Sequence, residues 1–479
     1  MPSGLSGINV ALQALLAHQQ SIEVIEHNVA NANTPGFHRQ SAVLQAGIPT
    51  SFSNLMGFYA GEMGTGVTVD NIMRYNLQFF DRRYRNEISD AKRWELESGV
   101  LQQIEATLGE AGTDGLTAKL DSFWQGWQNL SVDPSSTALK ADVLQRSKEL
   151  AEGIQTRYTK LTQIQIDQNA AFTQSVNDIN AKAEQIAQLN VEISHMLGTN
   201  QQPNDLMDQR DMLVDQIAEL TGSRADEQPN GMVTVSINGH SLVSGAEVHK
   251  LVATQGTLLT TVAWDNGDAF SADSGQLKAL QDLRDNVIPQ YQASLDKLAL
   301  NLANEVNSLH NPASPATHDP VYAAGMNFFT YSLSATPDPT NPAKGAAASL
   351  AVNTQMENLD NILGASAAYP SDGSIATSIA GLQNQTIANL GNIRFNEYTT
   401  QKAAELGLFT RQAESYSNDR SLVVKALEDQ RQSLEGVNLD EEAANLVKAQ
   451  KAFQAATRMV NVMDDLMNRI INGMGRAGL

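Results

Sequence analysis

Each end of this 479-residue chain carries a long apolar seam in coiled-coil spacing, and these two seams most constrain the fold. Both seams advance in steps of three and four residues, and Gln19 and Glu26 interrupt the first. The N-terminal seam comprises Leu5, Ile8, Leu12, Leu15, Ile22 and Val29, and the C-terminal seam comprises Leu446, Ala449, Phe453, Ala456, Val460, Met463, Met467 and Ile470. Matching seams predict that the two terminal helices pair and carry the rest of the chain.

Charge is distributed so that the ends stay close to neutral. The chain has 32 Lys and Arg against 53 Asp and Glu, a net charge of −21, yet no Lys or Arg precedes Arg39. This acidity argues against nucleic acid or an anionic membrane as a partner, because phosphate binding needs a basic face. A near-neutral apolar helix can pack densely against copies of itself, so we interpret the ends as an assembly surface.

The sequence between the ends predicts a mainly α fold with a β insertion. We expect long coiled-coil-like N- and C-terminal helices that pair, a helical-bundle shaft and a small β-rich central domain. Helical spacing without proline runs from Pro134 to Pro203, and Asn238-Gly239 marks a β-hairpin. The last helix is expected to start near Asp440 as its cap. The predicted division is 1–55 and 436–479 for the two halves of the terminal-helix domain, 56–221, 275–310 and 374–435 for the shaft, 222–274 for the β-rich insertion, and 311–373 for a loop- and β-rich outer part.

No motif for catalysis, metal binding or cofactor binding is recognisable, so none of these is predicted. The chain lacks cysteine, which excludes disulfides, a thiolate nucleophile and cysteine-ligated zinc. His18 and His27 do not share a helix face as ligands four residues apart would. The start Met1-Pro2-Ser3-Gly4 has no basic segment typical of a cleaved secretory signal, and no stretch reaches the length of a membrane span.

One row of acids needs a separate interpretation. Asp205, Asp208, Asp211 and Asp215 recur at three- and four-residue steps on one predicted helix. Such a row is compatible with a cation site or with an acid pair for glycoside cleavage. Because Arg210 lies among these acids, we interpret them as a solvated helix face.

Two stretches carry a family resemblance. The N-terminal stretch from Leu5 through Asn28-Val29-Ala30-Asn31-Ala32-Asn33-Thr34-Pro35-Gly36-Phe37 and the C-terminal stretch from Gly436-Val437-Asn438-Leu439-Asp440-Glu441-Glu442 to Ala456 resemble the signatures of bacterial flagellar rod, hook and hook-associated proteins. Pro35-Gly36-Phe37-His38-Arg39-Gln40, Trp127-Gln128-Asn129-Leu130 and Asn204-Asp205-Leu206-Met207-Asp208 are similar to the hook-associated family of the hook–filament junction. The chain departs from the family pattern at Phe37-His38, which stand where Tyr-Ser is common, at Ala443 in place of Met, and at Ala449 and Phe453 in place of tyrosines.

The resemblance implies a structural role outside the cell. Members of this family are exported unfolded through the flagellar type III apparatus without a cleaved signal, and their terminal helices form an inner tube. The implied partners are copies of the same chain, the hook protein, other hook-associated and filament proteins, and an export chaperone that binds the C-terminal helix.

Two other functions remain open at this stage. The first is a hook or distal-rod protein, although the long predicted helix before Pro203 argues against it. The second is a secreted adhesin or hydrolase whose β-rich middle binds glycan, although no convergent polar cleft is recognisable there.

Overall fold

The computed structural model describes residues 3–51, 62–109, 115–256, 259–311, 326–335, 338, 341–365 and 373–474. Contacts group the chain into two compact units. Unit 1 comprises Met1–Ile88, Ile179–Lys250 and Ser421–Leu479, and unit 2 comprises Ser89–Asp178 and Leu251–Arg420. Each unit is therefore assembled from segments that are far apart in the sequence. The seven-part division expected from the sequence stays a prediction.

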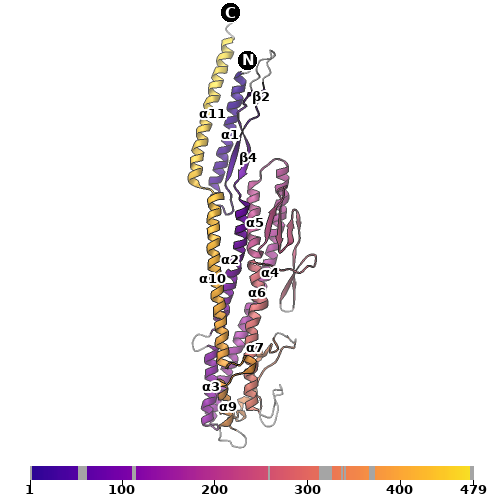
Figure 1. Ribbon diagram of the computed structural model, residues 1–479, viewed down its shortest axis with the longest axis vertical. Coiled ribbons are helices and arrows are strands. Elements are labelled where there is room, and N and C mark those ends of the chain that lie inside the picture. The colour runs from indigo at the N-terminus through magenta and orange to yellow at the C-terminus, as the bar shows by residue number, and fades with distance from the viewer. Residues whose placement is uncertain are drawn as a thin grey trace. The chain divides into compact units, whose positions relative to one another are not determined.

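The predicted fold class, mainly α with small β-sheets, is confirmed (Figure 1). The α-helices are α1 (Ser3–Ala30), α2 (Gln78–Leu108), α3 (Leu116–Val132), α4 (Thr137–Gly198), α5 (Asn204–Thr221), α6 (Gly275–Asp282), α7 (Ile288–His310), α8 (Ala346–Ser349), α9 (Ser374–Gly381), α10 (Phe395–Glu435) and α11 (Leu439–Met474). The strands are β1 (Gln40–Ala46), β2 (Thr50–Ser51), β3 (Glu62–Met63), β4 (Val67–Arg74), β5 (Arg224–Glu227), β6 (Val233–Ile237), β7 (His240–Ser244), β8 (Glu247–Val248), β9 (Leu251–Gln255), β10 (Thr260–Trp264), β11 (Phe329–Thr330) and β12 (Ala351–Val352).

In unit 1 the two terminal helices lie side by side, as the paired seams predict (Figure 1). They run antiparallel. Asn28, near the end of α1, is hydrogen-bonded to Glu442, near the start of α11. At the other end, a Cβ placed on Gly7 would lie 3.0 Å from Cε of Met463. A glycine at position 7 therefore lets the methionine approach the backbone of α1.

A two-stranded antiparallel ribbon packs on α1. It pairs β1 with β4, from Gln40 opposite Arg74 to Ala46 opposite Val67, with an irregularity between Val43 and Leu44. Gly66 precedes β4 with a φ of +107°, and a Cβ there would lie 3.1 Å from the carbonyl oxygen of Val10. Only glycine combines this conformation with so close an approach to the helix.

Unit 1 also holds the four-stranded sheet β5-β6-β7-β8. The predicted hairpin at Asn238-Gly239 joins β6 to β7, and both turn residues have positive φ. The sheet is attached to α4 through the fully buried Asn190. Its Nδ2 donates to the carbonyl oxygens of Val233 and Gly245, and its Oδ1 accepts from the Val233 amide.

The core of unit 2 forms around the aromatic face of α3. Phe123, Trp124 and Trp127 are fully buried there, as their helical spacing predicts. His310 at the end of α7 joins this core with its ring against Trp127. Its Nδ1 lies 2.7 Å from the carbonyl oxygen of Met326, and its Nε2 accepts from the amide of Leu363. Burial lowers the pKa of His310 to about 4, so the ring is neutral at pH 7.

Two helical stretches are less regular than their spacing predicts. The shaft segment predicted over 275–310 contains a π-helical segment, η1 (Leu283–Val287), between α6 and α7. Arg284 in this segment donates from Nη1 to Asn169 Oδ1 and to the Thr260 carbonyl oxygen, and its guanidinium lies over the ring of Phe172. The extra helical residue directs Arg284 at these partners.

The second stretch follows α9, where residues 382–394 form short 3₁₀ turns instead of continuing the helix. The spacing of apolar residues alone cannot distinguish such short 3₁₀ turns from a regular α-helix.

Candidate assembly surface and its buried charge network

The helix α1 has one face that is packed within the chain and one face that carries larger apolar side chains. The packed face consists mainly of small side chains, and its buried residues are Ala11, Ala17, Val24 and Asn28. The predicted seam lies beside this face. Leu12 is 46% exposed and Val29 43%, whereas Ile8, Leu15 and Ile22 are half-buried. The side chain of Leu5 lies outside the described part. Large apolar side chains of the N-terminal seam are therefore only partly covered by the monomer.

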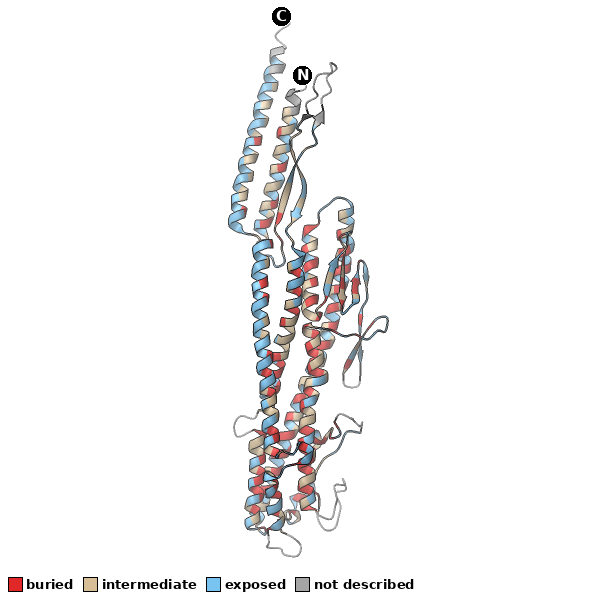
Figure 2. Cartoon of the chain, viewed as in Figure 1, coloured by how far each residue is buried: buried red, intermediate tan, exposed pale blue. Residues whose placement is uncertain are grey.

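The helix α11 places its predicted seam towards α1. Leu446, Phe453, Val460, Met463 and Met467 are half-buried, and Ala456 is buried. The side chain of Ile470 is not among those described. A second apolar set on α11 was not foreseen: Val447, Met459, Val462 and Leu466 are 47–57% exposed. Figure 2 shows α11 as mostly exposed. The sequence signal for this set was the apolar spacing of Met459, Val462 and Leu466, offset from the first seam.

The side chain of Asn28 connects the two terminal parts of the chain through hydrogen bonds. Its Nδ2 donates to the carbonyl oxygen of Gln40 at 2.8 Å and to Glu442 Oε2 at 3.0 Å, and its Oδ1 accepts from the Gln40 amide at 2.9 Å. Asn28 and Glu442 are both about 1% exposed. Arg39 completes the connection, with Nε 2.8 Å from Glu442 Oε1 and Nη1 2.8 Å from Glu441 Oε2.

The Asn-Thr-Pro-Gly segment forms the turn that leaves α1. Asn31 Oδ1 accepts from the Thr34 hydroxyl at 3.1 Å, and Gly36 has a φ of +75°. Asn33 and Pro35 are exposed on this turn. These motif residues therefore set the direction of the chain between α1 and β1.

Asn438 caps α11, which corrects the expectation for Asp440. The Asn438 side chain accepts from the amides of Asp440 and Glu441 at 3.0 and 3.3 Å. An asparagine side chain oxygen satisfies amides that have no partner in the first helical turn. Asp440 instead lies within that turn, and Leu439 is 54% exposed.

The acid row on α5 is not the solvated face that its spacing suggested. Asp208 and Asp211 are buried, and only Asp205 is freely exposed. Asp211 forms an ion pair with Arg74, at the end of β4, and Arg74 Nη1 is 3.2 Å from Asp208 Oδ1. The arginines that neutralise these acids come from other segments, so the row is an internal ion-pair ladder.

A second part of this ladder joins α2, α5 and α10. Asp215 Oδ1 is 2.6 Å from Arg85 Nε on α2, and Asp215 Oδ2 is 2.9 Å from Arg431 Nη1 on α10. Arg431 Nε is also 3.1 Å from Asp81 Oδ1. The guanidiniums of Arg74 and Arg85 hold the pKa of Asp211 below its usual range, although its burial acts in the opposite direction.

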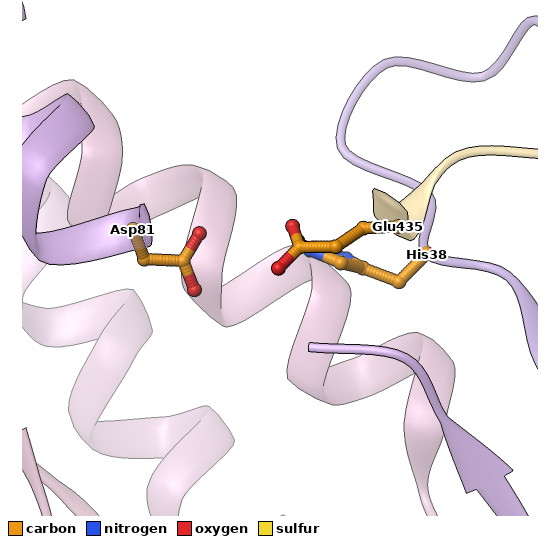
Figure 3. A group of neighbouring side chains, drawn as sticks. All are labelled: His38, Asp81 and Glu435. Carbon is orange, nitrogen blue, oxygen red and sulfur yellow. The ribbon is translucent and has the colours of Figure 1, made fainter. Parts of the chain in front are cut away.

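His38 occupies the centre of the network with Glu435 and Asp81 (Figure 3). Its Nδ1 is 2.6 Å from Asp208 Oδ1, and its Nε2 is 3.4 Å from Glu435 Oε2. Burial alone would lower the pKa of His38. The hydrogen bonds with the carboxylates of Asp208 and Glu435 outweigh burial and raise it to about 9. His38 is therefore a buried imidazolium at neutral pH.

The same three residues have a spacing that could suit a metal ion, since their ligand atoms lie within 4.8 Å of one another. The geometry favours ion pairing instead. A protonated His38 has no lone pair to offer a metal. Glu435 accepts from the Leu77 amide at 2.5 Å and lies 3.3 Å from Arg431 Nε. Cations already occupy the positions that a metal would neutralise.

The buried ion pairs of this network hold several segments of the chain together, and we call the network the charge clasp. His38, Arg74, Asp81, Asp211 and Glu435 come from a loop, a strand and three helices, and paired charges in a low dielectric hold one arrangement strongly. His38, which departs from the family pattern, is thus paired with Asp208 and Glu435 in this structure. Sequence reasoning missed the clasp because its arginines and acids are scattered over nearly 400 residues.

No helix in the described part of the chain is long and apolar enough to cross a membrane.

Comparisons with known proteins agree with this geometry. Residues 101–329 match the helical domain of the flagellar hook-associated protein FlgK, residues 8–38 match a flagella basal body rod protein, and residues 430–473 match the C-terminal region of the basal body rod proteins FlgEFG. Flagellar hook-associated protein 1 of Bacillus subtilis (strain 168) is 28% identical over the full length of both chains. The protein of the same name from Salmonella typhimurium is 24% identical, over 97% of this chain and 99% of the relative.

A solved structure, that of the flagellar hook junction protein FlgK from Burkholderia pseudomallei, has the same fold. It superposes with a TM-score of 0.61 and 16% identity, covering 74% of this chain and all of that one. Paired terminal helices with rod-type signatures at both ends define an axial protein of the bacterial flagellum. Within that class, the match of residues 101–329 to the FlgK helical domain and the full-length match to flagellar hook-associated protein 1 make the chain most similar to the FlgK hook-associated proteins among the matches described.

Proposed function

We propose that this chain is a structural axial protein that assembles at the hook–filament junction of the flagellum and joins the hook to the filament. The observation that carries this proposal is the combination of family and surface. The chain matches hook-associated proteins along its length, and its paired terminal helices leave large apolar side chains of both helices exposed. Exposed apolar faces of this kind are covered by protein partners.

The comparisons favour the junction over the hook or distal rod. The rod-type matches are confined to residues 8–38 and 430–473, whereas the 229 residues of 101–329 match the helical domain of the hook-associated protein. The ends are thus shared by axial proteins in general, and the middle distinguishes this family.

The partners follow from the same argument. Copies of this chain, the hook protein and other hook-associated or filament proteins would cover α1 and α11. An export chaperone would cover the exposed side of α11 before assembly, and the chain would leave the cell through the flagellar type III apparatus without a cleaved signal. In this account the protein is not an enzyme, and its charged clusters hold segments together.

Deletion of the gene tests the function. We expect cells without the chain to build hooks that carry no attached filament, and expression of the wild-type chain to restore filaments. Complete filaments on the deletion strain, seen by electron microscopy, would remove the junction proposal.

Two narrower tests address the partners and the middle of the chain. Deletion of residues after Gly436 should abolish binding of the export chaperone, and unchanged binding would exclude α11 as its site. Deletion of residues 222–262 tests whether the β-rich middle binds glycan, and we expect no loss of glycan binding from this deletion. Motility that persists while binding to glycan is lost would assign an adhesive role to the β-rich middle.

A further inference from the structure

Unit 2 contains an open cleft of about 1050 Å³ whose lining residues all belong to that unit. Its walls are formed by α4, by the junction of η1 with α7, by the loop before α8, and by the start of α10 with the turn that precedes it. Clefts that bind small molecules measure roughly 300–1000 Å³, so this one has room for such a ligand. Unit 2 therefore offers the convergent polar cleft that is not recognisable in the sequence of the β-rich segment.

Side-chain amides are the most numerous polar groups on these walls. They come from separate elements: Gln165 from α4, Asn286 from η1, Gln290 and Gln292 from α7, and Gln401 from α10. Asn286, Gln290 and Gln401 are exposed, so solvent and solutes can reach them. An amide carries both N–H donors and an acceptor oxygen, which allows it to pair with a hydroxyl group that donates and accepts. The cleft is therefore suited to a ligand rich in hydroxyl groups.

Charge in the cleft is close to balanced, with three lysines against two aspartates. Most of these groups are already paired within the protein. The pairs are Lys344 with Asp338 at 3.3 Å, Asp285 with Arg284 at 2.7 Å, and Lys402 with Glu405 at 2.7 Å. A charged ligand would have to compete with these partners, whereas a neutral ligand leaves them in place.

Asn341, in the loop before α8, adds an unused acceptor to the wall of the cleft. The residue is only 8% exposed, and its Nδ2 donates to Asp296 Oδ2 at 2.8 Å. Its Oδ1 has no hydrogen-bond partner among the residues that the structure describes. A buried acceptor without a partner costs free energy, and a hydroxyl donor that pairs with it recovers that cost.

The π-helical segment η1 shapes the wall where the amides gather. Gln165 Nε2 on α4 donates to the carbonyl oxygen of Arg284 in this segment at 2.9 Å. The next two residues, Asp285 and Asn286, line the cleft. Segments of this type inside α-helices are frequent at functional sites. The irregularity thus coincides with the cleft rather than with the closed core of the unit.

The cleft also has an apolar side, to which Tyr158, Pro289 and Leu390 contribute. A sugar ring combines C–H groups on its faces with hydroxyls at its edge, and tyrosine offers an apolar ring face with a polar tip. We propose that the cleft binds a neutral saccharide. Its hydroxyls pair with the amides of Asn286 and Gln290, and its C–H face lies on the apolar side.

A saccharide fits this surface better than a peptide does. Peptides that bind as an added strand use the backbone groups of a strand edge, and none of the described lining residues lies in a strand. Peptides that bind as amphipathic helices need an apolar groove. Here amides or charged side chains are present on every wall.

Saturation-transfer difference NMR on the full chain tests the proposal with two neutral probes, maltotriose and tri-N-acetylchitotriose. Saturation of the protein signals is transferred to ring protons only in a sugar that binds, and millimolar affinity is sufficient for detection. We expect transfer to the ring protons of at least one probe. Absence of transfer to both probes at millimolar concentration would overturn the proposal.

A double substitution locates the binding. Asn286→Ala with Gln290→Ala removes two exposed amides of the cleft and should weaken saccharide binding about tenfold, because two hydrogen bonds are lost. The matched control is Gln174→Ala with Asn177→Ala, which removes two exposed amides of α4 that do not line the cleft. Equal weakening by both pairs, or no weakening by the first, would overturn the assignment to this cleft. Urea unfolding curves that match the wild type verify that each variant is folded.

A further variant and a peptide probe complete the test. Gln401→Ala, on α10, should weaken saccharide binding about threefold, because one hydrogen bond is lost. Penta-alanine should receive no transfer. Transfer to penta-alanine that Asn286→Ala with Gln290→Ala abolishes, without transfer to either sugar, would make the cleft a peptide site and overturn the saccharide proposal.

This inference goes beyond the proposed function and does not depend on it. Saccharide binding is measured on the purified chain, whereas the junction function is tested by deletion of the gene. Loss of filaments on deletion together with no saccharide binding would overturn the inference and leave the function in place. Complete filaments on the deletion strain together with binding that requires Asn286 and Gln290 would support the inference and remove the junction function.

Discussion

Asn28 and Glu442 lie 414 residues apart in the sequence and are joined by a buried hydrogen bond of 3.0 Å between Asn28 Nδ2 and Glu442 Oε2. Through the same side chain Asn28 binds both backbone groups of Gln40. One asparagine thus holds the end of α1, the start of β1 and the start of α11 in one place.

Replacing Asn28 with alanine should destabilise unit 1. The substitution leaves buried groups of Gln40 and Glu442 without partners, at a cost of about 2–3 kcal/mol. Hydrogen exchange of the Gln40 amide would report the loss as faster exchange. Asn33→Ala is the control, because Asn33 is exposed on the turn and should change exchange little. Equal effects of both substitutions would contradict the role assigned to Asn28.

Asp211 and Asp205 on α5 should differ sharply when neutralised. Asp211→Asn removes the buried carboxylate that faces Arg74 and Arg85 and leaves Arg74 with Asp208 alone, which should cost about 3–5 kcal/mol. Asp205→Asn, at a side chain 59% exposed, should change the stability of α5 by less than about 1 kcal/mol. Urea unfolding followed by hydrogen exchange in residues 204–221 measures both. A solvated acid row would predict two small and similar effects.

The protonation of His38 should make unit 1 less stable at alkaline pH. Because its pKa rises from 6.5 to about 9 on folding, its stabilising effect is fully present below pH 6.5 and is lost as pH rises through 9. The loss is on the order of 3 kcal/mol. His38→Gln should remove most of this pH dependence in urea unfolding of unit 1. A wild-type protein whose unit 1 is equally stable at pH 6.5 and pH 9.5 would exclude a buried imidazolium.

His310 should give unit 2 the opposite dependence. Its pKa falls from 6.5 to about 4 on folding, so stability is full above pH 6.5 and is lost as pH falls through 4. The ring signals of His310 should stay those of neutral imidazole at pH 5.5 in an NMR titration. Titration of His310 near pH 6.5 would contradict the burial described for it.

Much of the regular structure could be predicted from periodicity and turn chemistry. The predicted helix that carries Asp205 to Asp215 is α5, and Asn238-Gly239 forms the predicted hairpin turn between β6 and β7, because both signals are local. The pairing of α1 with α11 was also predicted from their matching seams, but its antiparallel direction was not. In each case the signal itself is a spacing of residues that are close in sequence, even where, as for α1 and α11, the two elements are far apart.

The charge network could not be predicted in the same way. Periodicity showed that Asp208 and Asp211 share a helix face, but it could not show what covers that face. Their partners Arg74 and His38 are more than 130 residues away in the sequence. Likewise, the spacing of Met459, Val462 and Leu466 can be seen in the sequence, but it could not show that this side of α11 is left exposed beside α1.

The pairing of α1 with α11 also sets the order in which the molecule can become complete. A contact between residues 28 and 442 closes a very large loop, and such closures have a high entropic cost and form late. A polypeptide released before residue 442 has been made lacks the carboxylate that Asn28 binds and the helix that covers Gly7. Such a fragment presents α1 without its partner, so the surface formed jointly by α1 and α11 exists only on chains that have been synthesised through α11.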